Sequence, residues 1–218
     1  MAHILRCLFV RHGQTDHNLQ KRFQGHLPIP LNETGYLQAR RAGHLVQNLL
    51  KQEGQSKTKA TLFTSDLLRT IQTSLKIAQA LSNFEVSTLQ DPRLREFHSG
   101  LCTDKTFAEV SEEHPEIIKK YLTQFEKDPS NTPYPGEGGE SPRDVLKRFH
   151  DFFNDNICLH ESPWIVCSHG GALQTFLSYT TKMSRKNKLP THIGNGDVIE
   201  VQVDSGNWTI HRCYNNNQ

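Results

Sequence analysis

The chain has 218 residues, which is the length of one large domain or of one domain with a sizeable insertion. Lys and Arg number 25 against 23 Asp and Glu, so the formal net charge is +2, and no basic tail or stripe supports binding to nucleic acid. The longest apolar stretches, Cys7–Val10 and Trp164–Cys167, are far shorter than the roughly 20 residues of a membrane-spanning helix, so no membrane partner is expected. Histidine is frequent, with 12 copies, and its side chain titrates near neutrality.

The amino-terminal segment and the cysteines bear on the cellular compartment. Met1–Val10 is apolar, but it is interrupted by Arg6 and runs directly into Arg11-His12, so it is expected to be a first strand rather than a signal peptide. The 5 cysteines are scattered and form no C-x-x-C pair, so neither a disulfide framework nor a structural metal site is expected. These features predict a cytoplasmic location, with the nucleus left open as a further one.

Short β-rich runs alternate with helical periodicity in the first part of the chain. Ile4–Val10 is expected to be a strand buried on both faces, because its hydrophobicity is nearly continuous. Asn32 is the expected N-cap of a helix. Its apolar positions recur at helical spacing and are Ala39, Ala42, Val46 and Leu49. After a polar loop over Lys51–Lys59, a second strand is predicted over Ala60–Thr64.

The alternation continues to the carboxyl-terminal part of the chain. Ser65-Asp66 is predicted to cap a helix whose apolar face consists of Leu68, Ile71, Leu75 and Ala78. A third strand, Trp164–Cys167, precedes a helix over Gly170–Tyr179 with Leu173, Phe176 and Leu177 facing inward. Val198–Val203 and Trp208–Tyr214 are expected to form a β-hairpin, because the residues between them are typical of turns.

This pattern predicts an α/β fold, and residues 1–218 are interpreted as a single domain. Strands that alternate with helices favour a three-layer α/β/α sandwich around a mostly parallel sheet with an antiparallel edge strand. The segment Gly100–Glu140 interrupts the alternation with one predicted helix (residues 117–125) and a stretch rich in Pro and Gly. The capping box at Ser141 then starts the next helix, which is expected to bury Val145, Phe149, Phe152 and Phe153. We interpret residues 100–140 as a small cap over an active site, and a surface ornament is the alternative.

Charged and histidine side chains follow three predicted strands. Arg11-His12-Gly13 follows the first strand, Ser65-Asp66 with Arg69 follows the second, and Ser168-His169-Gly170-Gly171 follows the third. Ligands of open α/β sheets bind beyond the carboxyl ends of the strands, so these groups are expected to converge. Arginine forks, imidazoles and the free N–H groups of a helix start suit a phosphate or sulfate dianion, and a histidine beside a phosphoryl group can be its nucleophile.

At these positions the chain resembles the histidine phosphatase superfamily, which has the phosphoglycerate mutase-like fold. Residues 11–18, R-H-G-Q-T-D-H-N, are similar to the family's R-H-G-[EQ]-[TS]-x-x-N signature. The resemblance continues in the family's order through Phe23-Gln24-Gly25, Pro30-Leu31-Asn32-Glu33-Thr34-Gly35, Ser65–Thr70, Leu94-Arg95-Glu96, Gly139-Glu140-Ser141 and Ser168-His169-Gly170. It implies metal-free and cofactor-free catalysis on a phosphomonoester through a phosphoenzyme.

The resemblance also assigns roles to individual residues. It implies that His12 is the nucleophile and that Arg11, Arg69 and His169 bind and neutralise the phosphoryl oxygens. Further hydrogen bonds would come from Asn18 and from the Gly170 N–H, and Gln24 and Gly25 would line the pocket. Glu96 would be the proton donor of the first step and the base of the second; its alternative is a structural ion pair with Arg93 or Arg95.

The residues after Glu96 bear on which branch of the family the chain resembles. In the mutase branch, Arg and Tyr closely follow the acid and a basic pair lies further on. Here Phe97-His98-Ser99-Gly100 follows Glu96, and the nearby basic pair Lys119-Lys120 falls in a predicted helix, where it is expected to face solvent. The segment is more similar to fructose-2,6-bisphosphatase domains, TIGAR-type phosphatases and bacterial broad-specificity phosphatases.

The resemblance therefore predicts a phosphatase of small phosphorylated metabolites. The candidate substrates are fructose-2,6-bisphosphate first, then phosphoglycolate and other sugar and glycerate phosphates. Three alternatives remain: a cofactor-dependent phosphoglycerate mutase, a phosphoprotein phosphatase of the same fold, and a binding protein on a degenerate phosphatase fold. The sequence does not indicate an oligomeric state.

Overall fold

The computed structural model describes residues 5–51, 59–157, 159–160, 163–181 and 189–216. Its strands are β1 (Leu5–Arg11), β2 (Lys59–Thr64), β3 (Glu85–Gln90), β4 (Trp164–Ser168), β5 (Val198–Asp204) and β6 (Asn207–Tyr214). Its helices are α1 (Asp16–Leu19), α2 (Glu33–Lys51), α3 (Leu68–Ala80), α4 (Phe107–Glu113), α5 (Pro115–Lys127), α6 (Pro142–Asn156) and α7 (Gly170–Thr180), with 3-10 turns at Pro92–Leu94 and Gly100–Cys102. The predicted loop over Lys51–Lys59 lies largely outside the described residues.

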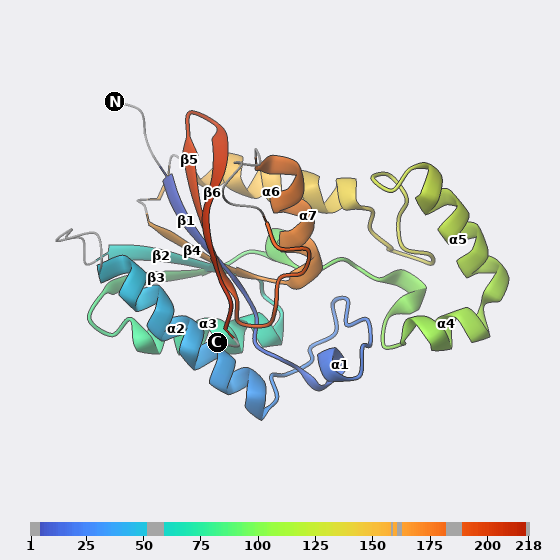
Figure 1. Cartoon of the computed structure of the whole chain (residues 1–218), viewed down its shortest axis with the longest axis horizontal. Helices are drawn as coiled ribbons and strands as arrows, with labels where there is room; N and C mark the ends of the chain where they lie inside the picture. Colours follow the sequence, from blue (N-terminus) through green and yellow to red (C-terminus); the bar gives the residue numbers. More distant parts are fainter. Residues whose placement is uncertain (1–4, 52–58, 158, 161–162, 182–188, 217–218) are drawn as a thin grey trace.

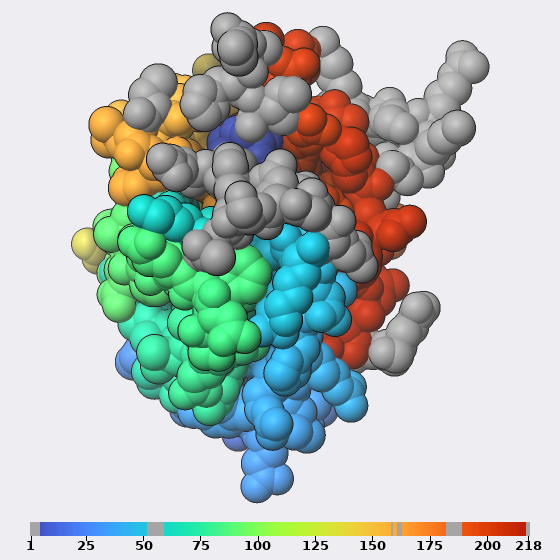
Figure 2. Space-filling view, turned by 90° about the vertical axis from the view of Figure 1, so that its left-hand side faces the viewer, coloured from blue at the N-terminus to red at the C-terminus, as the bar shows by residue number. Residues whose placement is uncertain are grey.

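The six strands form one sheet in the order β3-β2-β4-β1-β5-β6. The first four strands of this order run parallel, and β5 and β6 add an antiparallel hairpin at one edge. The hairpin turns at Ser205 and Gly206, whose φ values of 48° and 80° give the twist of a tight two-residue loop. Figure 2 shows the two margins of the sheet on opposite sides of the molecule, with the region of β3 in green and the hairpin in red.

Alternating residues of the central strand face two separate cores. Cys7 and Phe9 of β1 pack against α6 and α7, in a cluster that includes Phe149, Phe152 and Phe176. Leu8 and Val10 pack on the opposite face, against apolar residues of α2 and α3. Helices therefore cover both faces of the sheet (Figure 1), and the predicted three-layer α/β/α sandwich with an antiparallel edge is confirmed.

Several predicted elements are confirmed in detail. Asn32 Oδ1 accepts a hydrogen bond from the Gly35 N–H, as an N-cap does. The four apolar positions predicted to face inward on α2 are buried. Ser141 forms a capping box with Asp144 at the start of α6, and the four predicted apolar positions of that helix are buried.

The prediction for α3 is wrong at its start and on its buried face. The helix begins at Leu68 after the uncapped residue Leu67, although Ser65 Oγ accepts from the Leu67 N–H. Leu75 is 57% exposed. The buried positions are Arg69, Thr70, Thr73, Ser74 and Ile77, because small residues of α2 let the two helices approach closely: a Cβ at Gly43 would lie 2.9 Å from Ala80 Cβ.

Residues 100–140 lie beyond the carboxyl ends of the parallel strands, and Figure 1 shows α4 and α5 apart from the sheet. The segment contains two helices rather than the one predicted, and Thr106 and Glu109 form a capping box at the start of α4. Cys102, Val110 and Ile118 form a small core of their own, against which Phe23 and Tyr134 pack. The exposed lysines Lys119 and Lys120 face solvent, as predicted.

Candidate active site

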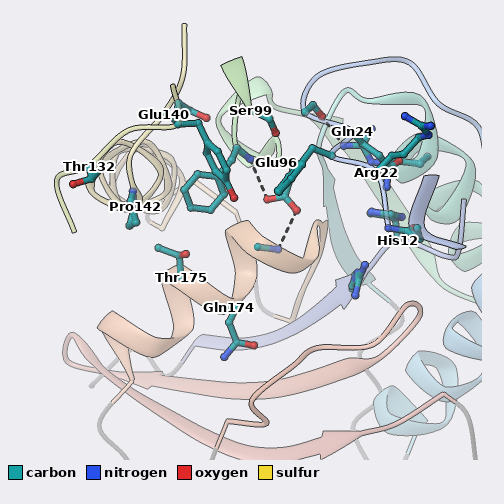
Figure 3. A pocket seen from close by; sticks show the side chains of 18 of the residues that line it. His12, Arg22, Gln24, Glu96, Ser99, Thr132, Glu140, Pro142, Gln174 and Thr175 are labelled. Carbon is teal, nitrogen blue, oxygen red and sulfur yellow. Dashed lines mark hydrogen bonds between the residues drawn. The ribbon is translucent and has the colours of Figure 1, made fainter. Parts of the chain in front are cut away.

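A cavity of about 450 Å³ lies between the strand ends and residues 100–140. One group of lining residues comes from β1, the loops after it and the start of α3: Arg11, His12, Asn18, Arg22, Phe23, Gln24, Gly25 and Arg69. The second group comes from the loop after β3, the cap segment and α7: Glu96, Phe97, Ser99, Tyr121, Phe125, Thr132, Tyr134, Glu140, Pro142, Gly171, Gln174 and Thr175. In Figure 3, Glu96 lies between His12 on one side and Thr132, Pro142 and Thr175 on the other.

His12 is buried, with 2% of its surface exposed, and its Nε2 has no hydrogen-bond partner among the residues that the structure describes. Nδ1 lies 2.7 Å from the carbonyl oxygen of Gly13. A carbonyl only accepts hydrogen bonds, so Nδ1 carries the proton and Nε2 keeps its lone pair. Burial lowers the pKa of His12 well below 6.5, and the positive charges of Arg69 and Arg11 lower it further. The ring is therefore neutral near pH 7 and presents a nucleophilic nitrogen.

Arg11 and Arg69 are buried cations without a carboxylate partner among the described residues. Arg69 is fully buried and donates to the carbonyl oxygens of Gly25 at 2.8 Å and Leu27 at 3.0 Å. Arg11 donates to the Ile193 carbonyl at 2.6 Å, and its buried Nε has no hydrogen-bond partner in the described part of the chain. Burial lowers the pKa of both guanidinium groups, that of Arg69 to about 10, which leaves both charged. Two buried, unpaired cations beside His12 are costly unless an anion binds there.

His169 contacts Arg69 and His12 and does not itself line the cavity. Arg69 Nε donates to His169 Nδ1 at 3.1 Å, so the proton sits on Nε2, which donates to Ser65 Oγ at 3.0 Å. The ring packs edge-on against His12, with centroids 5.2 Å apart. Burial, with the charge of Arg69, lowers the pKa of His169 well below 6.5. The structure thus gives this histidine a neutral ring that holds Arg69; its predicted contact with phosphoryl oxygens stays a prediction.

Glu96 lies at the amino terminus of α7, where three backbone amides donate to its carboxylate. The donors are Phe97 N at 3.0 Å, Gly171 N at 3.0 Å and Ala172 N at 2.8 Å. The alternative role of Glu96 in an ion pair is wrong, because Arg95 pairs with Asp66 and Arg93 with two other aspartates. Figure 3 shows the hydrogen-bonded carboxylate of Glu96 among the side chains that line the cavity.

The glycines that follow the two histidines allow close approach of protein groups. A Cβ at Gly170 would lie 2.9 Å from Arg11 Cζ, and one at Gly171 would lie 2.9 Å from Glu96 Oε1. A Cβ at Gly13 would meet the Gly35 carbonyl oxygen at 2.2 Å. Gly13 therefore serves packing against the first turn of α2.

The remaining predicted pocket residues form a polar network next to His12. Asn18 Oδ1 accepts from Thr15 N at 3.1 Å and from Asn195 Nδ2 at 3.2 Å, which leaves its own Nδ2 as a donor without a partner among the described residues. Gln24 Oε1 accepts from Thr15 Oγ1 at 3.0 Å. Gly25 lines the cavity in the left-handed region, with φ of 50°.

The segment before β5 contains functional residues that the sequence analysis missed. Asn195 Nδ2 donates to the His12 carbonyl at 3.0 Å, and the Gly196 N–H donates to the Arg11 carbonyl at 3.1 Å. The Ile193 carbonyl accepts from Arg11. The sequence signal was the turn-forming run Gly194-Asn195-Gly196-Asp197, which predicts a loop but not its contact with β1.

Among the described residues, no group of three or more His, Cys, Asp or Glu side chains could hold a metal ion. In the same part of the chain, no helix is long and apolar enough to cross a membrane.

The cavity combines a neutral imidazole with a free lone pair, two arginines without a carboxylate partner among the described residues, and a carboxylate. These are the groups that a phosphoryl-transfer site needs.

Comparison with known proteins gives the family. A family model described as the histidine phosphatase superfamily (branch 1) matches residues 7–216. Metal-independent phosphoserine phosphatase of Arabidopsis thaliana is 28% identical over 210 residues, which cover 96% of this chain and 81% of the relative. Phosphoglycerate mutase-like protein 4 of the same plant is 32% identical over 203 residues, covering 92% and 81%.

The fold also matches a solved structure of a mycobacterial glucosyl-3-phosphoglycerate phosphatase. The TM-score is 0.74 at 24% sequence identity, and the match covers 96% of this chain and 97% of the other. At this identity the likeness concerns the fold alone. Taken with the family model and the relatives, the site defines a phosphoryl-transfer enzyme of the hydrolase class. The chain belongs to the histidine phosphatase superfamily and is a phosphatase.

Proposed function

We propose that the protein is a metal-independent phosphomonoesterase that hydrolyses small phosphorylated metabolites through a phosphohistidine on His12. The observation that carries the proposal is the state of that ring, which is buried and neutral, with Nε2 unprotonated and with Arg11 and Arg69 nearby, neither paired with a carboxylate among the described residues. Those cations supply the charge stabilisation that a metal ion supplies in other phosphatases.

In the first step, His12 Nε2 attacks phosphorus and the bond from phosphorus to the ester oxygen breaks. Arg11 and Arg69 neutralise the equatorial oxygens, where charge is spread in the transition state. Asn18 Nδ2 and the Gly170 N–H add to this binding, and His169 contributes to it by holding Arg69 in place. Gln24 and Gly25 shape the wall of the pocket. Glu96, in its protonated form, gives its proton to the departing alkoxide, so the alcohol leaves neutral.

In the second step, Glu96 accepts a proton from water and the resulting hydroxide attacks the phosphorus of phosphohistidine. The bond from phosphorus to Nε2 breaks, inorganic phosphate leaves, and both His12 and Glu96 return to their starting protonation states. Two displacements replace one difficult displacement by water, which is the advantage of a covalent intermediate.

The cavity favours hydrolysis over the mutase alternative. Lys119 and Lys120 are exposed on α5 and are not among the described residues that line the cavity, so this basic pair is not placed to hold a substrate carboxylate. The sequence resemblance offers fructose-2,6-bisphosphate, phosphoglycolate and other sugar and glycerate phosphates as substrates. Which of them fits depends on the part of the cavity remote from His12.

The test is to trap the phosphoenzyme. Wild-type protein is mixed with a ³²P-labelled phosphomonoester, quenched in alkali and assayed for label that is stable to base and lost in acid. We expect label on the wild type and on His44→Ala, an exposed control on α2, and none on His12→Ala, whose kcat falls at least about 10⁴-fold. Label on His12→Ala, or turnover by that variant near the wild-type rate, would contradict the proposal.

A further inference from the structure

The end of the cavity remote from His12 is built from aromatic rings in mutual contact. Tyr134 stacks on Tyr121, with centroids 5.9 Å apart and planes at 17°, and packs edge-on against Phe23 at 5.7 Å and Phe97 at 5.8 Å. Phe125 continues the cluster from Tyr121 at 5.8 Å. All five rings line the cavity. We call Phe23, Phe97, Tyr121, Phe125 and Tyr134 the aromatic wall.

The charged groups beside the aromatic wall are already paired with residues outside the cavity. Arg22 makes a bidentate ion pair with Glu109, both bonds at 2.7 Å, and also donates to the Asp104 carbonyl. Glu140 accepts from Arg148 at 2.8 and 3.1 Å. Burial raises the pKa of Tyr121 and of Tyr134, so both hydroxyls stay neutral near pH 7.

Among the described residues that line the cavity, the cations without a carboxylate partner are Arg11 and Arg69, and both lie at His12. In the described part of the lining, a second phosphate or a carboxylate on the substrate would meet the rings, the carboxylates of Glu96 and Glu140, neutral hydroxyl and amide side chains, and Arg22, whose charge is already paired with Glu109. Moving an anion from water into such surroundings without a partner is costly. A flat uncharged group would instead displace water from the aromatic wall, which is favourable.

We propose that the substrate is the monophosphate ester of a bulky, uncharged alcohol or phenol with a flat apolar face, and that the aromatic wall binds this leaving group. The inference rests on the proposed function of the site. A cavity of about 450 Å³ lies within the range of about 300–1,000 Å³ that takes drug-sized ligands, and so exceeds what a phosphoryl group alone fills. Thr175 on α7 adds a hydroxyl to the lining of the cavity (Figure 3). Fructose-2,6-bisphosphate and phosphorylated acids are therefore expected to be poorer substrates than such an ester.

The test compares phosphonates, which bind but are not hydrolysed. Dissociation constants are measured by calorimetry for methylphosphonate, 1-naphthylmethylphosphonate and 3-phosphonopropionate. We expect the naphthyl compound to bind at least about tenfold more tightly than methylphosphonate, because one methylene in an apolar pocket is already worth about tenfold. The carboxylate of 3-phosphonopropionate should give no gain over methylphosphonate.

Two variants of α5 locate the effect. Phe125→Ser should lose most of the preference for the naphthyl compound, because it removes a ring of the aromatic wall. Leu122→Ser is the matched control, since Leu122 is 46% exposed on the same helix and does not line the cavity. Equal affinities for the naphthyl and methyl compounds, tightest binding of 3-phosphonopropionate, or an equal loss in both variants would overturn the inference.

Turnover separates this inference from the proposed function. The wild type is assayed with 1-naphthyl phosphate, fructose-2,6-bisphosphate and 3-phosphoglycerate, and the largest kcat/KM is expected for the first. If the phosphonates rank as expected but no phosphomonoester is hydrolysed, the proposed function fails and the binding inference stands. If the bisphosphate or the acid is hydrolysed best, the inference fails and the proposed function stands.

Discussion

The two ends of the cavity are built in opposite ways. At the His12 end, buried charged and polar groups from three strand ends are fixed by hydrogen bonds, and within the described ranges two arginines there have no carboxylate partner. At the other end, the rings of the aromatic wall are held mainly by residues 100–140, and charges are paired away from the cavity. The first arrangement suits chemistry common to all phosphomonoesters, and the second suits selection of a leaving group. Variants at the two ends should therefore fail in different ways.

Glu96 lies between the two ends of the cavity. Of the substitutions whose effect depends on the leaving group, its replacement should lower kcat the most. Glu96→Gln cannot give a proton, so we expect kcat for an alkyl phosphate to fall between about 10²- and 10⁴-fold. An aryl phosphate with an acidic phenol as leaving group needs no proton in the first step and should lose much less in that step. Stopped-flow measurement of alcohol release from both substrates tests this. Equal losses would mean that Glu96 does not protonate the leaving group.

A loss that is uniform across substrates is expected at Arg69. Arg69→Gln removes a buried charge from the phosphoryl group, and kcat/KM should fall about 10²- to 10³-fold for alkyl, naphthyl and sugar phosphates alike. Steady-state kinetics with three such substrates measures the loss, and Arg40→Gln on the exposed face of α2 is the control. If the loss varied strongly with the leaving group, the proposed division of the cavity would break down.

The smallest expected effect is on the free energy of unfolding in acid, and it should differ between variants at the two ends of the cavity. Burial lowers the pKa values of His12 and His169 well below 6.5, so the unfolded chain takes up their protons first as the pH falls. The contribution of the two histidines to the free energy of unfolding is fully present above their pKa in the unfolded chain, near 6.5, and is lost as the pH falls toward their lower pKa values in the folded protein. In that range, each histidine lowers the free energy of unfolding by up to about 1.4 kcal/mol per pH unit.

Urea unfolding between pH 7.5 and pH 5 measures this slope. His12→Gln should flatten the fall in unfolding free energy below about pH 6.5. Phe125→Ser, at the aromatic end, should keep the wild-type slope. Identical slopes for the wild type and His12→Gln would show that His12 titrates normally in the folded protein, and its neutral state would then need another explanation.

The sequence predicted the His12 end better than the aromatic end for physical reasons. Strands buried on both faces, such as β1 and β4, carry near-continuous hydrophobicity, and the residues directly after them reach the sheet edge by geometry alone. Among the parallel strands, β3 was missed because it is an edge strand of mainly exposed residues, E-V-S-T-L-Q, without apolar alternation. The buried face of α3 was misassigned because the helix approaches α2 closely at Gly43, where a large side chain would not fit, although Val46 and Leu49 of α2 still share a core with Ile77.

Contacts between loops that lie far apart in the sequence could not be predicted from local sequence patterns. Asn195 reaches the His12 carbonyl across 183 positions of the sequence, and no periodicity marks it. The aromatic wall draws on Phe23, Phe97 and three residues of the cap segment. Phe23 and Tyr134 meet at the small core around Cys102 and Ile118, whereas Phe97 belongs to the main core. Glu96 and His169 were found from family motifs, but only the structure shows that one contacts the α7 amides and the other holds Arg69.

The most direct test of the account is the position of the phosphoryl group on the trapped enzyme. Nδ1 of His12 donates to the Gly13 carbonyl, so the account predicts phosphorylation of Nε2 alone. Mass spectrometry of peptides from the alkali-quenched protein identifies the residue, and ³¹P and ¹⁵N NMR of protein with labelled histidine identifies the nitrogen. A single phosphohistidine at His12 Nε2 is the predicted result. Phosphate on Nδ1, on His169 or on another residue would contradict the account.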